Sequence, residues 1–338
     1  MTFTVGVQNS PEFKNSYTME PMSQKRMSAR ISACWALLLC INIPCSPNAQ
    51  VKPPSPIPNE LLPYFHARTL MDFDTRELTE FMPELRNLEF AKSQDELPAL
   101  LDRVGATVEA FFRDYPNTAA VEDVWQERQA PTGEIDQYLK KKYHYVITAR
   151  SGMEELGLDE IRMNLRDELL DQEDLKRGYL LTTGHSSAPL YFHPRHRPAC
   201  DFRLLGRANA PRQTIVIAFA QNPEKTQTWG TISLHEVEQP ILEQGVIWIA
   251  SDTFQIVRMR SDLLVKRPDI RLDQHTAVID FAEVNFKTLP RSFWLPREVQ
   301  IIVRFEGWRF QNRHRYSQYR LFSVESQDGP KKLVPHPR

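Results

Sequence analysis

From residue 141 almost to its C-terminal end, the chain is a succession of short apolar segments, and this feature constrains the fold most. The segments are rich in β-branched and aromatic residues, turn residues separate them, and no long stretch of helical period interrupts them. We therefore expect an α+β protein in which an antiparallel meander of about ten strands curls into an open half barrel, preceded by a helical N-terminal segment. The expected strands are residues 143–149, 160–166, 178–183, 202–208, 213–220, 228–235, 245–250, 254–260, 276–286, 297–305 and 308–322.

Polarity alternates along several of these segments. Alternation with a period of two indicates a sheet with one buried and one solvated face. The segment GVIWIASDTFQIVRMR, residues 245–260, departs from this pattern: it predicts a hairpin whose first strand is apolar on both faces and is therefore covered on both sides. In this hairpin Val246, Trp248 and Ala250 lie on one face, and Ile247 and Ile249 on the other. In the last hairpin Val299, Ile301 and Val303 alternate with Glu298, Gln300 and Arg304.

The stretch RFQNRHRYSQYR, from Arg309 to Arg320, is the one basic cluster of the sequence. Basic residues with interleaved tyrosines can bind single-stranded nucleic acid. However, the chain holds 42 Lys and Arg against 43 Asp and Glu, a net charge of −1, and shows no electrostatic footprint for nucleic acid. We therefore expect an antiparallel strand with a solvated face here, and no nucleic-acid partner.

Helical period precedes the strand-rich part. One continuous apolar stripe predicts a helix from about residue 96 to 114, with Pro98 in its first turn and Pro116 after its end. A further short helix is expected at residues 118–129, with Val121, Val124 and Trp125 facing inward. The residues of the apolar stripe are Leu97, Leu100, Leu101, Val104, Val108, Phe111 and Phe112.

The N-terminal region carries the pattern of an export signal. Residues 22–30 form a basic leader and residues 31–43 an uncharged apolar run, which is typical of a secretory signal peptide. The run is shorter than the ~20 apolar residues of a membrane span, and a proline-rich linker follows at residues 51–63. We expect translation to begin at Met22 or Met27. The mature protein then begins near residue 50, in the periplasm or outer envelope of a Gram-negative-type bacterium.

Cysteine placement leaves a lipid anchor as an alternative. Cys40 and Cys45 lie near the end of the apolar run, but neither follows the small residue that a lipoprotein signal peptidase prefers. Removal of the signal would leave Cys200 alone, so we expect no internal disulfide. The expected organisation is a signal peptide with a mis-called start at 1–49, a linker at 50–70, a helical segment at 71–135, an antiparallel β domain at 136–327 and a tail at 328–338.

The loop at residues 184–201 carries the enzymatic alternatives. Its start, GHSSA, is similar to the nucleophile motif G-x-S-x-G, which requires a strand-to-helix turn, but the residues that follow have no helical period. Imidazole and thiolate groups in the same loop are natural zinc donors, yet the prolines at 194 and 198 favour a surface loop. We therefore assign no catalytic residue, metal or cofactor, and keep a secreted hydrolase or metal-dependent enzyme as the alternative. The donor groups are His193, His196, Cys200 and Asp201.

One resemblance to a known family is carried by residues 245–260, together with TAVIDFAEVNF and FWLPREVQI further along the chain. The sequence from 141 to 324 resembles bacterial outer-membrane lipoprotein-sorting proteins of the LolA/LolB-like superfamily, as a divergent exported relative. The resemblance implies an incomplete barrel around a hydrophobic cavity that receives acyl chains. In the first hairpin it is carried by Trp248, Ile249, Asp252, Thr253, Ile256 and Arg258, and Ala250 departs from a more usual polar position.

These patterns favour an exported protein that binds or carries an apolar or acylated ligand, such as a lipoprotein, without chemistry of its own. Peripheral membrane contact is compatible with this role. A third alternative is a structural or interaction protein whose barrel is filled by its own side chains. We expect the ligand to be bound by Trp248, Ile249, Phe254, Ile256, Arg258, Trp294 and Val299, with Arg258 or Arg260 meeting a polar head at the rim.

Overall fold

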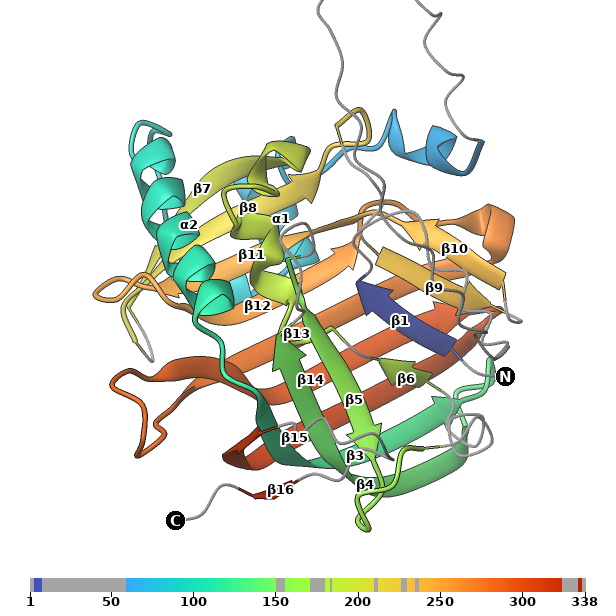
Figure 1. Ribbon diagram of the computed structural model, residues 1–338. Helices are drawn as coiled ribbons and strands as arrows, with labels where there is room; N and C mark the ends of the chain where they lie inside the picture. Colours follow the sequence, from blue (N-terminus) through green and yellow to red (C-terminus); the bar gives the residue numbers. More distant parts are fainter. Residues whose placement is uncertain are drawn as a thin grey trace, which may run out of the picture. The chain divides into compact units, whose positions relative to one another are not determined.

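An antiparallel sheet of twelve strands dominates the structure, which is a computed structural model (Figure 1). From β11 to β15, neighbours in the sheet follow one another along the chain, as in a meander. Among the described strands β2 does not pair with β5, so the sheet stays open. Its order is β2 (Glu89–Phe90), β7 (Cys200–Ala208), β8 (Thr214–Gln221), β11 (Glu243–Ala250), β12 (Ile256–Leu263), β13 (Leu272–Val284), β14 (Phe293–Phe305), β15 (Trp308–Ser323), β3 (Thr118–Gln129), β4 (Ile135–Ala149) and β5 (Leu158–Met163), and β16 (Val334–Pro335) pairs with β15.

The structure describes residues 3–7, 59–149, 156–170, 180–182, 184–209, 212–225, 230–234, 237–323 and 334–335. The predictions on the basic leader, on the apolar run 31–43 and on Cys34, Cys40 and Cys45 concern residues outside these ranges. A smaller sheet of four strands has the order β10 (Val237–Ile241), β9 (Gly230–Leu234), β1 (Phe3–Val7) and β6 (Leu180–Thr182), in which β1 runs parallel to β6. The helices are α1 (Thr75–Phe81) and α2 (Leu97–Arg113), and short 3-10 helices span Asn59–Tyr64, Pro83–Leu85, Ala188–Phe192, Arg197–Ala199 and Pro268–Ile270.

The predicted α+β class and its mostly antiparallel sheet are confirmed, and so is the long helix. α2 has Pro98 in its first turn and ends at Arg113, before Pro116. The helix expected at residues 118–129 is wrong, because this segment is β3. Every second side chain from Thr118 to Gln126 is buried there, and three of these, Thr118, Glu122 and Gln126, are polar.

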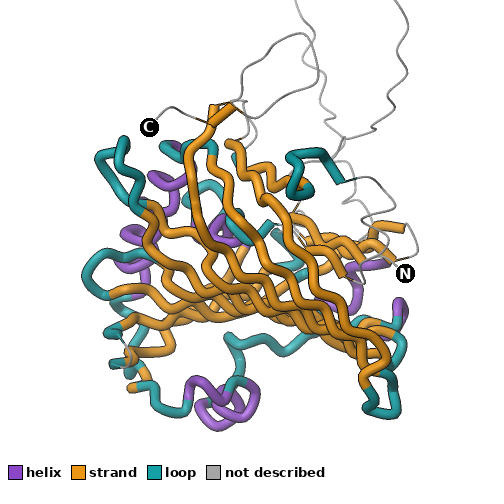
Figure 2. The backbone as a smooth tube through the Cα atoms, turned by 90° about the horizontal axis from the view of Figure 1, so that it is seen from below, coloured by secondary structure: helices purple, strands orange, loops and turns teal. Residues whose placement is uncertain are grey.

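The two faces of the main sheet have different cores. The inner face, which carries Ile217, Ile247 and Ile301, packs against α2 and the 3-10 helix Ala188–Phe192. The outer face, which carries Val216 and Trp248, packs against Leu78 of α1 and its flanking segments. Helical segments accordingly lie on both sides of the sheet (Figure 2). None of the described helices has the length and apolar character needed to cross a membrane.

The predicted hairpin at 245–260 is confirmed as β11 and β12. Trp248 pairs with Arg258 across it, and β8 covers the other edge of β11. Val246 and Trp248 belong to the outer core, whereas Ile247 and Ile249 belong to the inner core, as the alternation predicts. The solvated faces of the last strands are also confirmed, since Val299, Ile301 and Val303 are buried while Gln300 and Arg304 are exposed.

Candidate functional site

A cleft opens between α2 and the ends of two hairpins, and we call it the α2 cleft. Thr107 and Phe111 of α2 form one side, and Gln255, before β12, and Trp294, in β14, form the other. Its volume is about 650 Å³, within the ~300–1,000 Å³ of small-molecule pockets. The other lining residues are Ala106, Ala110, Asn285, Pro290, Arg291, Ser292 and Phe293.

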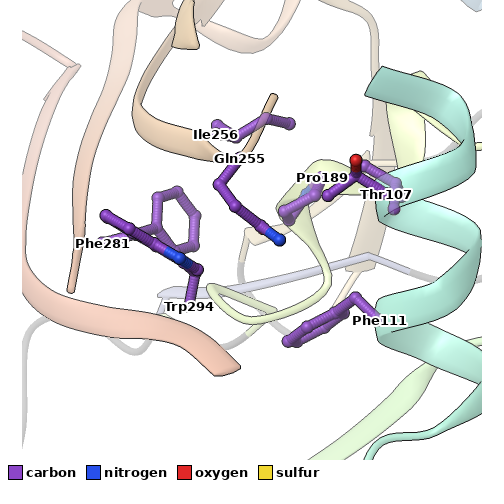
Figure 3. A pocket seen from close by; sticks show the side chains of 8 residues that line it. Thr107, Phe111, Pro189, Gln255, Ile256, Phe281 and Trp294 are labelled. Carbon is purple, nitrogen blue, oxygen red and sulfur yellow. The ribbon is translucent and has the colours of Figure 1, made fainter. Parts of the chain in front are cut away.

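The inner end of the α2 cleft is an apolar hollow (Figure 3). Ile256, Phe281 and Trp294 of the sheet lie across it from Phe111, and Pro189 of the 3-10 helix also lines it. The hollow measures about 20 Å³, which is room for about one water molecule. Side chains therefore fill the space beneath α2, and the accessible part of the site is the outer cleft.

The filling of the inner face comes largely from the 3-10 helix Ala188–Phe192. The ring of Tyr191 stacks on that of Phe219 with centroids 4.9 Å apart, and Phe192 meets Phe219 edge-on at 5.7 Å. These aromatic pairs occupy the sheet's inner side next to the hollow. A ligand larger than the outer cleft would have to displace them.

The rim of the α2 cleft is held by a three-residue charge cluster, Arg113, Asp114 and Arg291. Nη1 of Arg291 donates to Oδ2 of Asp114 at 2.6 Å, and Nη2 donates to the carbonyl oxygen of Ala110 at 2.7 Å. Asp114 also accepts two hydrogen bonds from Arg113, both at 3.0 Å. The hydrogen bond from Arg113 and the charge of Arg291 keep the pKa of Asp114 below its ordinary value. The guanidinium of Arg291 lies over the ring of Phe293, 4.8 Å from its centroid.

A second arginine stands over the aromatic wall. The guanidinium of Arg212 lies 5.6 Å from the ring centroid of Trp294 and donates to both carboxylate oxygens of Asp252, at 2.7 and 2.9 Å. Asp252 belongs to the turn of the β11–β12 hairpin. Cation–π contact of this kind fixes the orientation of the indole ring. The mouth of the α2 cleft is therefore built from aromatic rings covered by guanidinium groups.

The structure divides the seven predicted ligand-binding residues between the two faces of the sheet. Ile256 and Trp294 line the hollow. Ile249 and Val299 belong to the inner core, and Phe254 packs against it. Trp248 belongs to the outer core. The structure thus brings five of the seven to one side, while ligand binding by any of them stays a prediction.

Trp248 and the predicted rim arginines lie on the outer face. Arg258 covers the ring of Trp248 at 5.5 Å and pairs with Asp280 at 3.2 Å. Arg260 pairs with Asp262 and Glu84, each at 2.8 Å. These arginines therefore do not line the α2 cleft, and the arginine that does is Arg291.

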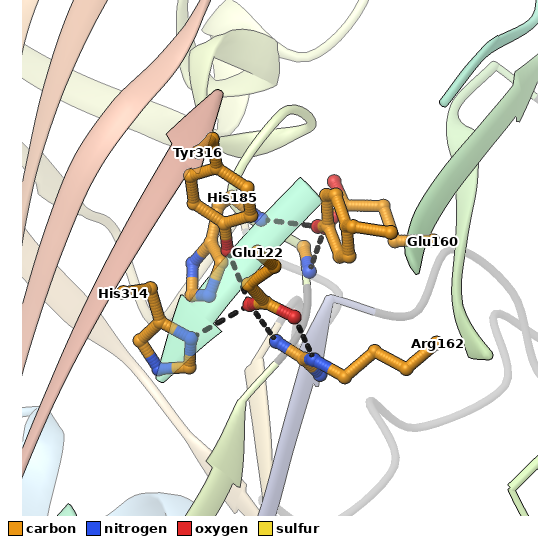
Figure 4. A network of polar contacts seen from close by, with 8 residues as sticks. Glu122, Glu160, Arg162, His185, His314 and Tyr316 are labelled. Carbon is orange, nitrogen blue, oxygen red and sulfur yellow. Dashed lines mark hydrogen bonds and ion pairs between the residues drawn. The ribbon is translucent and has the colours of Figure 1, made fainter. Parts of the chain in front are cut away.

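A buried polar network lies on the inner face, away from the α2 cleft (Figure 4). Arg162 of β5 donates two hydrogen bonds to Glu122 of β3, at 2.6 and 2.8 Å. Nδ1 of His314 lies 2.7 Å from Oε1 of Glu122, and the hydroxyl of Tyr316 donates to the same oxygen at 2.9 Å. Burial raises the pKa of Glu122, but the charges and hydrogen bonds of Arg162 and His314 together outweigh it, and the pKa lies well below its ordinary value.

Glu160 of β5 binds the backbone of the GHSSA loop. Its carboxylate accepts hydrogen bonds from the N–H groups of Gly184, His185 and Ser186, at 2.7, 3.0 and 2.8 Å. The hydroxyl of Tyr145 donates to it as well. Burial raises the pKa of Glu160 to about 7, although the hydrogen bonds from Ser186 and Gly184 lower it. The protein's own carboxylate therefore occupies this nest of amides.

A second buried glutamate holds the other end of the same segment. The hydroxyl of Tyr191 donates to Oε2 of Glu243 at 2.6 Å, and Ser261 donates to its Oε1 at 3.3 Å. Nδ1 of His275 lies 3.2 Å from that Oε1. Burial raises the pKa of Glu243, but the contacts of His275 and Tyr191 outweigh it and the pKa is lowered. The segment 184–192 is thus attached to the sheet through two carboxylates.

The 184–201 loop does not form the geometry of a nucleophile motif. The N–H of Ser187, which follows the candidate nucleophile and would have to stabilise an oxyanion, donates to the carbonyl of Gly184 at 3.1 Å. The surface loop expected from the prolines is confirmed only in part, because Pro194, Arg195 and Pro198 are exposed whereas Ser186, His193 and Cys200 are buried. Within the described part of the chain, no three His, Cys, Asp or Glu residues come together as a metal site.

Sequence reasoning missed Arg291 and Asp114 as a pair. They are 177 positions apart, and no local pattern links them. The sequence did indicate the cleft itself, because Trp294 and Ile256 were both predicted as residues of an apolar ligand-binding wall.

Comparisons with known proteins found similar solved structures. No family model matches the chain, and no curated protein matches it. The chain is similar to an outer membrane lipoprotein-sorting protein domain from Vibrio parahaemolyticus, with 10% identity and a TM-score of 0.37, over 65% of this chain and 91% of that one. It is similar to a DUF1329 family protein from Desulfovibrio piger, with 11% identity and a TM-score of 0.33, over 66% of this chain and 92% of that one.

Proposed function

We propose that this chain is an exported protein of the periplasm or outer envelope that binds or carries an apolar or acylated ligand in an open half barrel. The observation that carries the proposal is the α2 cleft. It combines an open outer part of about 650 Å³ with an apolar inner end formed by Phe111, Ile256, Phe281 and Trp294. Small-molecule sites are typically clefts of this size in which apolar surface is combined with polar groups that fix the orientation of the ligand.

The inner core supports a binding role rather than chemistry. The two carboxylates best placed for acid–base work, Glu122 and Glu160, are engaged by donors of the chain itself. Neither lines the α2 cleft. In this proposal the acyl chain enters between α2 and Trp294 and extends toward the hollow.

Fluorescence quenching by a spin-labelled fatty acid tests the proposal. The nitroxide quenches tryptophan on contact, so saturable quenching is expected from Trp294 at the cleft. Trp294→Phe should remove most of the saturable change. Trp248→Phe is the matched control, because Trp248 lies on the opposite face of the sheet, and this variant should keep the change.

Two outcomes would count against the site. If neither variant alters a saturable signal, the ligand binds elsewhere. If no saturable quenching occurs below the aggregation limit of the fatty acid, the chain does not bind acyl ligands at all. Thermal unfolding of each variant shows whether a lost signal reflects lost binding or lost structure.

A further inference from the structure

Among the residues that line the α2 cleft, Arg291 is the one with a charged side chain, and this group identifies the polar part of a ligand. Arg113 and Arg291 both bind the single carboxylate of Asp114. Two positive charges and one negative charge leave a net charge of one positive. The C-terminal end of α2 contributes about −0.5 of a charge at the same place. Glu109 beside Arg113 and Glu283 beside Ser292 add negative charge nearby, so the positive charge is local to the guanidinium of Arg291.

Arg291 has donors left for an incoming group. A guanidinium carries five N–H donors, and those of Arg291 make two hydrogen bonds among the described residues, to Asp114 and to the carbonyl of Ala110. Its side chain is 36% exposed, so a ligand can reach it from solvent. Stacking on Phe293 keeps the plane of the guanidinium fixed at the cleft wall.

The other lining residues are uncharged, but Ser292 donates a hydrogen bond to the exposed carboxylate of Glu283 at 2.6 Å. The polar side chains that line the α2 cleft besides Arg291 are Thr107, Gln255, Asn285 and Ser292, and the lining contains no carboxylate. The hydroxyls of Thr107 and Ser292 already donate, to the carbonyl oxygen of Arg103 and to Glu283, so the amides of Gln255 and Asn285 are the groups that can donate hydrogen bonds to an anion. At the inner end the lining becomes apolar, with Ile256 and Phe281.

We propose that the α2 cleft selects an amphiphile with an anionic head group, which binds Arg291 at the rim while its acyl chain lies along Phe111 and Trp294. This inference rests on the proposed function, because it names the ligand class of the same site. A carboxylate or a phosphate would satisfy it equally, since both accept two parallel hydrogen bonds from a guanidinium.

The test compares the affinity of the full chain for four amphiphiles of equal chain length: a fatty acid, an alkyl phosphate, a monoacylglycerol and an alkyltrimethylammonium. We expect one or both anionic members to bind at least tenfold more tightly than the neutral one, and the cationic one to bind most weakly. The difference in affinity between the anionic and neutral amphiphiles should decrease as the salt concentration rises, because salt screens the charge of the rim. The fatty acid and phosphate arms show which anion is preferred.

Two variants change the rim charge in opposite directions. Arg291→Gln should reduce the anionic preference to within about twofold, whereas Asp114→Asn, which raises the net charge of the cluster, should increase it. An increase cannot come from unfolding, so this variant separates charge from stability. Equal affinity of the unmodified chain for neutral and anionic amphiphiles would overturn the head-group inference and leave the proposed function standing. Binding of none of the four would overturn the proposed function itself.

Discussion

Arg162 and Glu122 form a two-point ion pair with Nε–Oε2 and Nη2–Oε1 distances of 2.6 and 2.8 Å, and both side chains are buried. His314 and Tyr316 contact the same carboxylate, so four groups from three strands meet at one point. A buried charge that loses its partner is far more costly than an exposed one. This relationship leads to the first prediction.

Glu122→Gln should lower the free energy of unfolding by about 3–5 kcal/mol, because it leaves the Arg162 charge buried without a counterion. Urea denaturation measures the loss. Glu298→Gln is the matched control, since Glu298 pairs with the exposed Arg313 on the solvated side of the sheet, and an exposed pair contributes about 1 kcal/mol or less. Equal losses in the two variants would show that the Glu122 network is not buried as described.

The pKa of Glu160 predicts a pH dependence of stability. Burial raises this pKa from 4.5 to about 7, so between these values the folded chain binds more protons than the unfolded chain. The contribution of Glu160 to stability is therefore complete below about pH 4.5 and is lost as the pH rises through 7. Urea midpoints measured from pH 4.5 to 8 should show this loss in the difference between the wild type and Glu160→Gln.

Glu160→Gln removes the titration of this carboxyl group. The variant is therefore the reference with which the wild type is compared at each pH. Histidines contribute in the opposite direction, because burial lowers the pKa of His196 to about 4 and also lowers those of His193 and His314. The histidines contribute equally to both proteins, so their contributions cancel in the difference between the free energies of unfolding of the wild type and the variant. A difference that stays constant with pH would show that Glu160 does not titrate in this window.

Val104→Asp should destabilise the fold by several kcal/mol, because Val104 of α2 is fully buried against the inner face and an aspartate there has no partner. Ala106→Asp, an exposed site on the same helix, should change the free energy of unfolding by about 0.5 kcal/mol or less. Chemical denaturation compares the two. Similar effects would place α2 away from the sheet.

Gly245→Ala should also destabilise the chain. A Cβ atom at Gly245 of β11 would come within 2.0 Å of the carbonyl oxygen of Arg260 on β12 and within 2.8 Å of the Phe219 ring. The hairpin would have to separate, which costs ladder hydrogen bonds as well as packing. Thermal unfolding should show a clear drop in midpoint, and an unchanged midpoint would contradict the close approach of these strands.

The sequence predicted those strands, and their buried faces, in which apolar and polar residues alternate regularly. In residues 246–250 of β11 and in β14 the buried side chains are apolar, so alternation alone identified their orientation. It failed for β3, where the buried positions include Glu122 and Gln126. Polar groups are tolerated there because their partners arrive from distant parts of the chain: Arg162 lies 40 positions from Glu122, and His314 lies 192. No local pattern carries that information.

The apolar wall of the candidate site could be predicted from the sequence, but its charged rim could not. Trp294 and Ile256 were expected at an apolar wall and line the hollow. Alternation should have separated Trp248 from Ile249, because neighbours on a strand face opposite sides. The rim depends on tertiary contacts between α2 and the start of β14, and only the structure reveals it.

The attachment of residues 184–192 to two glutamates has a mechanical consequence. Glu160 lies on β5 and Glu243 on β11, with six strands between them in the sheet order. An open sheet has no closing ladder to fix how strongly it bends. Because the segment is hydrogen-bonded to both strands, its length limits how far apart β5 and β11 can lie. Inserting a few glycines into this segment should let the sheet flatten while every strand keeps its neighbours. The volume on the inner side of the sheet would then depend on a loop rather than on the strands that enclose it.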